Sequence, residues 1–226
     1  MPDWAVEQKE FWESIRRRNL WFIKLRYIIV ILLSTFLFTT TFIFKINYSE
    51  TQLTAGVIII ASILFYNFIL HRARKYVRLD VNKFNPLYLS LFQIELDLIA
   101  LLMLVYYTGG IESPLYMQFV FLVIIGSLIL PGILVYTMAA IFIIAFTALT
   151  ILEGYEVIAH HPINGMLNFS LYDNPNYVAA FLFTFAFMTF VSVYLANGMA
   201  RQLYKREKDL VDSMKKINVA EKEKQK

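Results

Sequence analysis

The chain has 226 residues, of which 58% are apolar and 17% are charged, against about 25% charged residues in soluble domains. It contains no cysteine, which excludes disulfides, thiol redox chemistry and thiolate metal sites within it. Its formal net charge is +4, but the basic residues are dispersed between long apolar blocks. That distribution favours a bilayer with anionic lipid as the partner and argues against nucleic acid.

Six apolar blocks follow one another along the chain, and the fourth is the shortest. A helix needs roughly 20 residues to cross the hydrocarbon core of a membrane. We therefore predict an all-α membrane protein with six transmembrane helices. The blocks are residues 25–46, 53–70, 87–107, 115–130, 133–152 and 177–196.

The basic residues predict the orientation of these helices. Of the 21 Lys and Arg residues, all but Lys45 lie on one side of the six blocks. Because cytoplasmic loops accumulate Lys and Arg, that side is expected to be cytoplasmic and to hold both termini. The predicted location is the bacterial inner membrane, with multiple crossings.

Residues 1–24 are predicted to form a cytoplasmic amphipathic helix that Asp3 caps. Trp4, Phe11, Trp12 and Ile15 share its apolar face. Such a helix lies in the membrane interface or, alternatively, packs on the protein's own loops. Residues 25–199 then form the six-span sensor domain.

The third block carries three polar residues near its middle, Gln93, Glu95 and Asp97. Charged groups at this depth are costly, so they need partners or a function. Gln93 and Asp97 are four apart and share a helix face, whereas Glu95 faces elsewhere. The set is either structural hydrogen bonding within the bundle or a proton-linked or ligand-facing site. The expected partners are Arg26, Asn67 and His71.

The outer turn after this block is predicted to be a tight hairpin at the membrane surface. Gly109 and Gly110 free the backbone directly after Tyr107, and Pro114 fixes the return into the next helix. An amphipathic ligand that is flat can stack on the tyrosines at this level.

Pro131 and Gly132 are expected to turn the chain between the fourth and fifth helices, because the uncharged stretch 115–152 is too long for one crossing. Residues 153–176 form the longest outer loop. His160 and His161, near Glu153, Glu156 and Asp173, allow an external metal or pH site. Their spacing matches no strong metal-ligand motif, so the alternative is an ordinary exposed loop, and no metal is predicted.

Residues 200–226 are predicted to form a cytoplasmic signalling helix. Leu203, Leu210 and Ile217 recur every seven residues, with Met214 between the last two. This pattern favours a parallel coiled coil and a homodimer, and the alternative is a solvated tail helix. The helix is expected to continue in a longer protein as the linker to an output domain. The 226 residues contain no catalytic motif of their own.

The hairpin residues resemble the G-G-x-x-N-P-F heptapeptide in the membrane sensor region of RegB-type histidine kinases, which have six spans. Ser113 replaces its Asn, and Leu115 replaces its Phe. Supporting matches are Lys24-Leu25-Arg26, Asp97, Leu130-Pro131 and the charged helix from Arg201. The resemblance implies a quinone (ubiquinone or menaquinone) bound near residues 109–115. The residues that it implies as ligand-binding, together with the adjacent tyrosine, are Tyr107, Gly109, Gly110, Ser113, Pro114 and Leu115.

We therefore predict the transmembrane sensing module of a bacterial two-component histidine kinase that responds to quinone or membrane redox state. A response regulator is a partner only through domains outside these residues. One alternative is the same module attached to another output, such as a diguanylate cyclase. The other is a small transporter or channel in which Glu95 and Asp97 line a pathway, but the spans show no inverted repeat.

Overall fold

The computed structural model describes residues 9–76, 85–165, 167 and 169–224. Within this part the chain is helical, and no strand forms apart from an isolated bridge between Asn47 and Asn164. The prediction of an all-α fold is confirmed. The helices are α2 (Lys9–Phe42), α3 (Glu50–Ala73), η1 (Arg74–Tyr76), α4 (Pro86–Tyr107), η2 (Gly110–Glu112), η3 (Pro114–Met117), α5 (Gln118–Ser127), α6 (Gly132–Gly154), η4 (Leu171–Asp173) and α7 (Pro175–Lys224).

Five of the described helices are long and apolar enough to cross a membrane, and a shorter apolar segment, Pro114–Ser127, makes the sixth. All six apolar blocks are therefore helical. The chain is a multi-pass membrane protein. The break between α5 and α6 lies at Pro131 and Gly132, where turn chemistry predicted it.

Local sequence explains where the helices of the second and third crossings begin. Ser49 and Gln52 form a reciprocal capping box at the start of α3, in which each side chain binds the other residue's backbone N–H. Asn85 caps α4 with its side-chain oxygen, and Pro86 occupies the first turn. Proline is suited to that position because its missing N–H would have no helical partner there.

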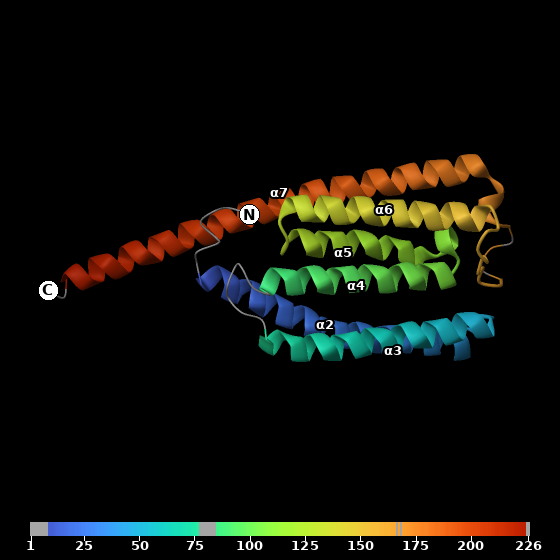
Figure 1. Cartoon of the computed structure of the whole chain (residues 1–226), viewed down its shortest axis with the longest axis horizontal. Helices are drawn as coiled ribbons and strands as arrows, with labels where there is room; N and C mark the ends of the chain where they lie inside the picture. The colour runs from blue at the N-terminus through green and yellow to red at the C-terminus, as the bar shows by residue number, and fades with distance from the viewer. Residues whose placement is uncertain (1–8, 77–84, 166, 168, 225–226) are drawn as a thin grey trace.

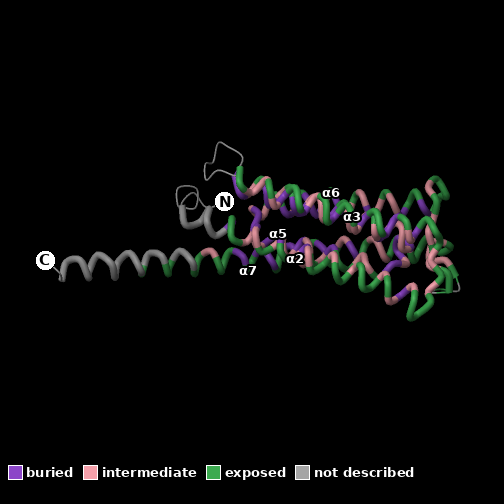
Figure 2. The backbone as a smooth tube through the Cα atoms, turned by 90° about the horizontal axis from the view of Figure 1, so that it is seen from below, coloured by how far each residue is buried: buried purple, intermediate pink, exposed green. Residues whose placement is uncertain are grey.

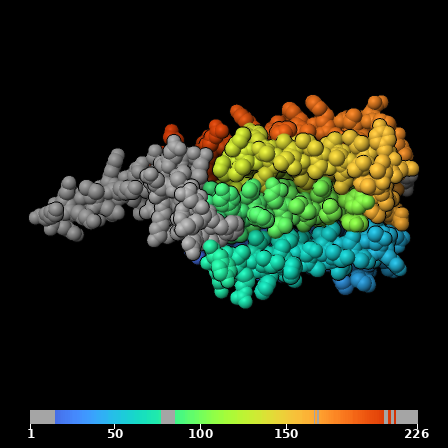
Figure 3. All heavy atoms as spheres, viewed as in Figure 1, coloured from blue at the N-terminus to red at the C-terminus, as the bar shows by residue number. Residues whose placement is uncertain are grey.

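The helices run side by side as one elongated bundle, with α7 extending far beyond it at one end (Figure 1). Helix α4 is central, since it contacts α2 and α3 on one side and α5 and α6 on the other. Helix α7 packs on α5 and α6. The space-filling view shows α3, α4, α6 and α7 forming one continuous side of the bundle (Figure 3).

The main apolar core lies between α4, α5, α6 and α7. Its centre is a group of aromatic rings from three helices, Phe119, Phe142, Phe146 and Phe185, all buried. The outward helix faces carry exposed apolar side chains, such as Phe36 on α2. Figure 2 shows this division, with buried residues along the inner faces of the helices. Exposed apolar faces of this kind are solvated by lipid in a membrane.

Two predicted domain boundaries fall within continuous helices. Helix α2 passes residues 24 and 25 without a break, and α7 passes residues 199 and 200 in the same way. The division into 1–24, 25–199 and 200–226 remains a prediction. Asp3 and Trp4, and the side chains of Phe11, Trp12, Met214 and Ile217, lie outside the described part of the structure.

Candidate functional site

A buried polar cluster lies in the interior of the membrane bundle, between α2, α3 and α4. We call it the Arg26 cluster: Arg26, Tyr66, Asn67, Gln93 and Asp97. Arg26 binds Asp97 through two parallel bonds, Nε to Oδ1 at 2.7 Å and Nη2 to Oδ2 at 2.7 Å. Arg26 is 4% exposed and the Asp97 side chain is 18% exposed, so the guanidinium is buried and the carboxylate is mostly buried.

The other members of the Arg26 cluster complete its hydrogen bonding. Arg26 Nη1 donates to Gln93 Oε1 at 3.0 Å and to Asn67 Oδ1 at 3.5 Å. The Tyr66 hydroxyl donates to Asp97 Oδ1 at 2.7 Å. Three helices are thereby joined at one guanidinium. A buried charge pair is tolerated only with such extra bonds, because each ion loses its hydration.

The Arg26 cluster contains two of the three polar residues predicted on the third span. Gln93 and Asp97 share the face that meets Arg26, as their spacing of four residues predicted. Glu95 is half-buried on another face, outside the cluster. Of the expected partners, Arg26 and Asn67 belong to it, but His71 does not, and its buried Nδ1 has no hydrogen-bond partner within the described residues.

A small cavity of about 30 Å³ adjoins the cluster between α2, α4 and α5. Gln93 lines it, and the buried Nε2 of Gln93 has no hydrogen-bond partner among the described residues. A volume of this size has room for one water molecule. The Gln93 amide nitrogen is therefore a donor without an acceptor among the described residues, and it lies beside a space in which a small polar molecule fits.

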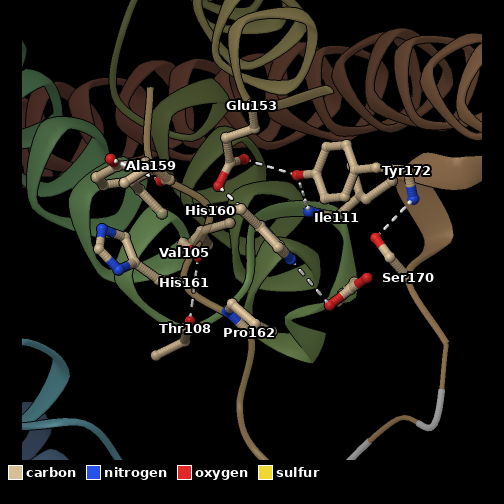
Figure 4. A network of polar contacts seen from close by, with 12 residues as sticks. Val105, Thr108, Ile111, Glu153, Ala159, His160, His161, Pro162, Ser170 and Tyr172 are labelled. Carbon is tan, nitrogen blue, oxygen red and sulfur yellow. Dashed lines mark hydrogen bonds and ion pairs between the residues drawn. The ribbon is translucent and has the colours of Figure 1, made fainter. Parts of the chain in front are cut away.

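A second polar cluster lies at the end of the bundle that is predicted to face outward, where Glu112, Glu153, His160 and Tyr172 meet (Figure 4). We call it the outer cluster. His160 Nδ1 is 3.3 Å from Glu153 Oε1, and His160 Nε2 is 3.2 Å from Glu112 Oε2. An ionised carboxylate can only accept, so with both glutamates ionised each ring nitrogen carries a proton and the ring is an imidazolium.

Tyr172 anchors the long outer loop to the third–fourth hairpin. Its hydroxyl donates to Glu153 Oε2 at 2.6 Å and accepts the backbone N–H of Ile111 at 3.2 Å. Burial first, and then the hydrogen bond to Glu153, raise the pKa of Tyr172 well above its ordinary value. The hydroxyl therefore remains protonated and keeps donating to the Glu153 carboxylate.

The two hairpin glycines have backbone dihedrals that other residues rarely adopt: φ is +111° at Gly109 and +59° at Gly110. Gly110 is also buried, and a Cβ there would overlap the Tyr172 hydroxyl and Glu153 Oε2. The predicted tight hairpin is confirmed. The structure gives Gly110 a packing role, since its backbone lies directly under the outer cluster.

The remaining predicted hairpin residues occupy different environments. Ser113 is fully buried, and its hydroxyl caps η3 and is 2.7 Å from the Thr108 hydroxyl. Pro114 is exposed and Leu115 is half-buried against the main core. The Tyr107 ring packs against His161, with ring centroids 5.0 Å apart. The set is thus contiguous in sequence but does not line a single pocket.

The prediction of which acidic residues lie near His160 is only partly correct. Glu153 does bind His160, but Glu156 and Asp173 are exposed and take no part in the outer cluster. Glu112, which comes from the preceding hairpin, supplies the second carboxylate. No group of His, Asp or Glu side chains in the described part of the chain is arranged to hold a metal ion.

An open groove of about 720 Å³ runs along the lipid-facing junction of α3 and α4. Its lining is mostly apolar, with Ile58, Ile99 and Met103 among its walls. Tyr107 lines it as well, and Tyr66 connects it to the Arg26 cluster. The groove therefore combines a long apolar surface with phenol groups from two helices.

The helices, hairpin and clusters belong to a six-span architecture that matches one known family. A family model described as the PilS-like transmembrane domain matches residues 9–210. The chain belongs to this family. PilS is a sensor histidine kinase, so the PilS-like domain is the six-span membrane region of a sensor-kinase type. The coarser part of the predicted resemblance is confirmed, while the RegB type itself remains a prediction.

Comparison of this PilS-like domain with curated proteins and with solved structures gave no significant match.

We expect the outer cluster of the PilS-like domain to be most stable at acidic pH. Burial lowers the pKa of His160, but the hydrogen bonds and negative charges of Glu153 and Glu112 outweigh it and raise the pKa overall. The stabilising contribution of a raised pKa is complete below the unfolded value of about 6.5 and disappears as pH rises through the folded value.

Hydrogen exchange measures this loss. After correction for intrinsic rates, amide exchange in residues 155–174 should accelerate as pH rises through that window. His160→Gln should remove the pH dependence, whereas His161→Gln, whose ring stacks on Tyr106 and Tyr107, should keep it. A pH-independent wild-type loop would contradict the assignment of an imidazolium at His160.

Proposed function

We propose that this chain is the membrane sensing module of a bacterial two-component sensor histidine kinase. It lies in the inner membrane with both termini in the cytoplasm, and it acts as a parallel homodimer. Phosphorylation of a response regulator belongs to domains outside these residues. Membership of the PilS-like family and the one-sided distribution of basic residues support this proposal.

The observation that carries the proposal is the length of α7. This helix runs unbroken from Pro175, next to the outer loop, to Lys224, and its candidate span ends at Arg206. A stiff helix of this kind passes a shift or rotation at the outer loop to the opposite side of the membrane. Signal transfer also requires two arrangements whose balance a ligand changes.

Exposed leucines at the end of the candidate span and just beyond it favour a partner helix. Leu203 is 50% exposed and Leu210 is 64% exposed, seven residues apart on α7. Large apolar side chains in water at this spacing are stabilised by a parallel coiled coil. A second copy of the same helix satisfies this requirement with its own leucines.

We test the proposal in a fusion of residues 1–226 to the catalytic region of a sensor histidine kinase. Leu210→Cys should form a disulfide-linked dimer in membranes, because this position faces its copy, and the link should hold autophosphorylation at one fixed level. Asp209→Cys, one residue away on the same helix, should crosslink much less. Equal crosslinking at both positions, or no autophosphorylation in the uncrosslinked fusion, would contradict the proposal.

We further propose that the signal is a membrane-borne quinone, as the hairpin resemblance implies, and that it occupies the α3–α4 groove. The groove supports this because its apolar walls suit an isoprenoid tail and the Tyr107 hydroxyl can donate a hydrogen bond to a quinone oxygen, whereas the Tyr66 hydroxyl already donates to Asp97. Tyr107 is the predicted ligand residue that the groove includes.

A groove-filling substitution tests the quinone proposal. Ala100 lines the groove, and Ala100→Trp should abolish photolabelling of the purified chain by a quinone analogue because the indole occupies the space. Ala61→Trp is the matched control, since Ala61 is exposed on α3 and does not line the groove. Loss of labelling in both variants, or in neither, would reject this location.

A further inference from the structure

A basic cleft of about 310 Å³ lies at the end of the bundle where α2 begins, α3 ends and α4 begins (Figure 1). Three arginines line it: Arg16 and Arg17 from α2, and Arg74 from η1, which directly follows α3. No acidic side chain of the described residues lines it. The cleft therefore concentrates positive charge between separate transmembrane segments.

The arginines have unused hydrogen-bonding capacity. Arg74 is half-buried, and its Nε, which is shielded from solvent, has no hydrogen-bond partner among the described residues. Arg16 and Arg17 are exposed, and the structure gives neither an ion pair within its described part. A buried N–H that lacks a partner is costly, so a ligand that accepts hydrogen bonds gains from binding here. Guanidinium groups match phosphate oxygens in geometry as well as charge.

The wall of the cleft is held in place by a buried hydrogen-bond network. Asn19 is 2% exposed, and its Nδ2 donates to the carbonyl of Pro86 at 2.8 Å. Its Oδ1 accepts from the Ser90 hydroxyl at 2.7 Å. These bonds tie the first turns of α4 to α2 without using the arginines. The three guanidinium groups are thereby left for a ligand on a framework that is already fixed.

The depth of the cleft matches the lipid headgroups. The candidate spans begin at Ile15 and Pro86 and end at Tyr76, so Arg16, Arg17 and Arg74 all lie within a turn of a span boundary. Leu20 and Leu89 form the apolar part of the lining, toward the membrane interior. Basic clefts between transmembrane helices at this level bind the headgroups of anionic phospholipids.

We propose that this cleft binds the phosphate of an anionic phospholipid, which the proposed topology places in the cytoplasmic leaflet. Three arginines favour a lipid with two phosphates, such as cardiolipin, over one with a single phosphate. A soluble phosphate ion has the same recognition chemistry, but it gains nothing from the leucine wall. The bound lipid bridges α2 to η1 at the end of α3, and the Arg26 cluster joins α2 to α3 deeper in the membrane.

Native mass spectrometry of the whole purified chain, titrated with cardiolipin, phosphatidylglycerol or phosphatidylcholine, tests the proposal. Arg16→Gln/Arg17→Gln/Arg74→Gln should weaken cardiolipin binding at least about tenfold more than Lys24→Gln/Arg72→Gln/Lys75→Gln, because one charge-assisted hydrogen bond corresponds to about tenfold. The control triple removes the same charge from exposed residues outside the cleft. Equal weakening in the two triples would show general attraction to anionic surfaces and overturn the site.

Two further measurements keep the proposal falsifiable if the triple variant folds poorly. The single variants Arg74→Gln and Arg72→Gln each remove one positive charge from the same end of α3. Only Arg74 lines the cleft, so only Arg74→Gln should weaken cardiolipin binding. Thermal unfolding with inorganic phosphate separates the two sources of phosphate. Stabilisation by inorganic phosphate with none by cardiolipin would overturn the assignment to a lipid.

Discussion

Asp97→Leu should destabilise the bundle by on the order of 3–5 kcal/mol, because it leaves the Arg26 guanidinium buried without its counter-ion. Arg26→Met should cost a similar amount, since the Asp97 carboxylate then remains inside the membrane with the Tyr66 hydroxyl but without a cation. The double variant should cost less than the sum of the two, because it removes both charges together. Reversible unfolding of the purified chain in mixed micelles measures all three values.

Glu95→Leu is the matched control for Asp97→Leu. Glu95 is an acid on the same helix, two residues away, and it is outside the Arg26 cluster. Its replacement should leave stability unchanged or increase it, since it removes a costly carboxylate from a membrane span. If Asp97→Leu were no more harmful than Glu95→Leu, the Arg26–Asp97 pair would not be a structural element of the fold.

Gly110→Ala should cost substantially more stability than Gly165→Ala, although both glycines have a positive φ. Gly165 has φ +82° and no atom near an added Cβ, so alanine there brings only backbone strain, about 1–2 kcal/mol. At Gly110 the methyl group also displaces the Tyr172 hydroxyl and the Glu153 carboxylate. Losing those buried hydrogen bonds adds about 1–3 kcal/mol.

Thermal unfolding of the two alanine variants in one detergent gives the difference directly. The Gly110→Ala variant should also lose the pH dependence of exchange in residues 155–174, because the outer cluster no longer closes. Equal destabilisation by the two substitutions would mean that the close packing of the Gly110 backbone against Tyr172 and Glu153 adds nothing to stability beyond the positive φ of the turn.

The features that sequence predicted well depend on local chemistry. Six crossings follow from hydropathy, and the break at Pro131 follows from turn residues. The spacing of Gln93 and Asp97 placed them correctly on one helix face. Each of these depends on residues that are near one another in the chain.

The side-chain contacts that could not be predicted from the sequence depend on how segments far apart in the chain pack together. Asp97 is bound by Tyr66, 31 residues away, and His160 by Glu112, 48 residues away. Proximity in sequence favoured Glu156 and Asp173 as neighbours of His160, but both are exposed, Glu156 just after α6 and Asp173 in η4. A buried carboxylate in the hairpin is a signal that only the packed structure makes visible.

The unbroken α7 also has the length and continuity of a lever arm. Its 50 residues span about 75 Å at about 1.5 Å per residue. A rotation of this helix by about ten degrees about its outer end displaces Lys224 by about 13 Å. If the axis of rotation lies close to the outer loop, a shift of less than about 1 Å near Pro175 therefore moves Lys224 by several ångströms. Because α7 packs on α5 and α6 and buries Phe185 and Val193 in the main core, such a pivot also moves this interface.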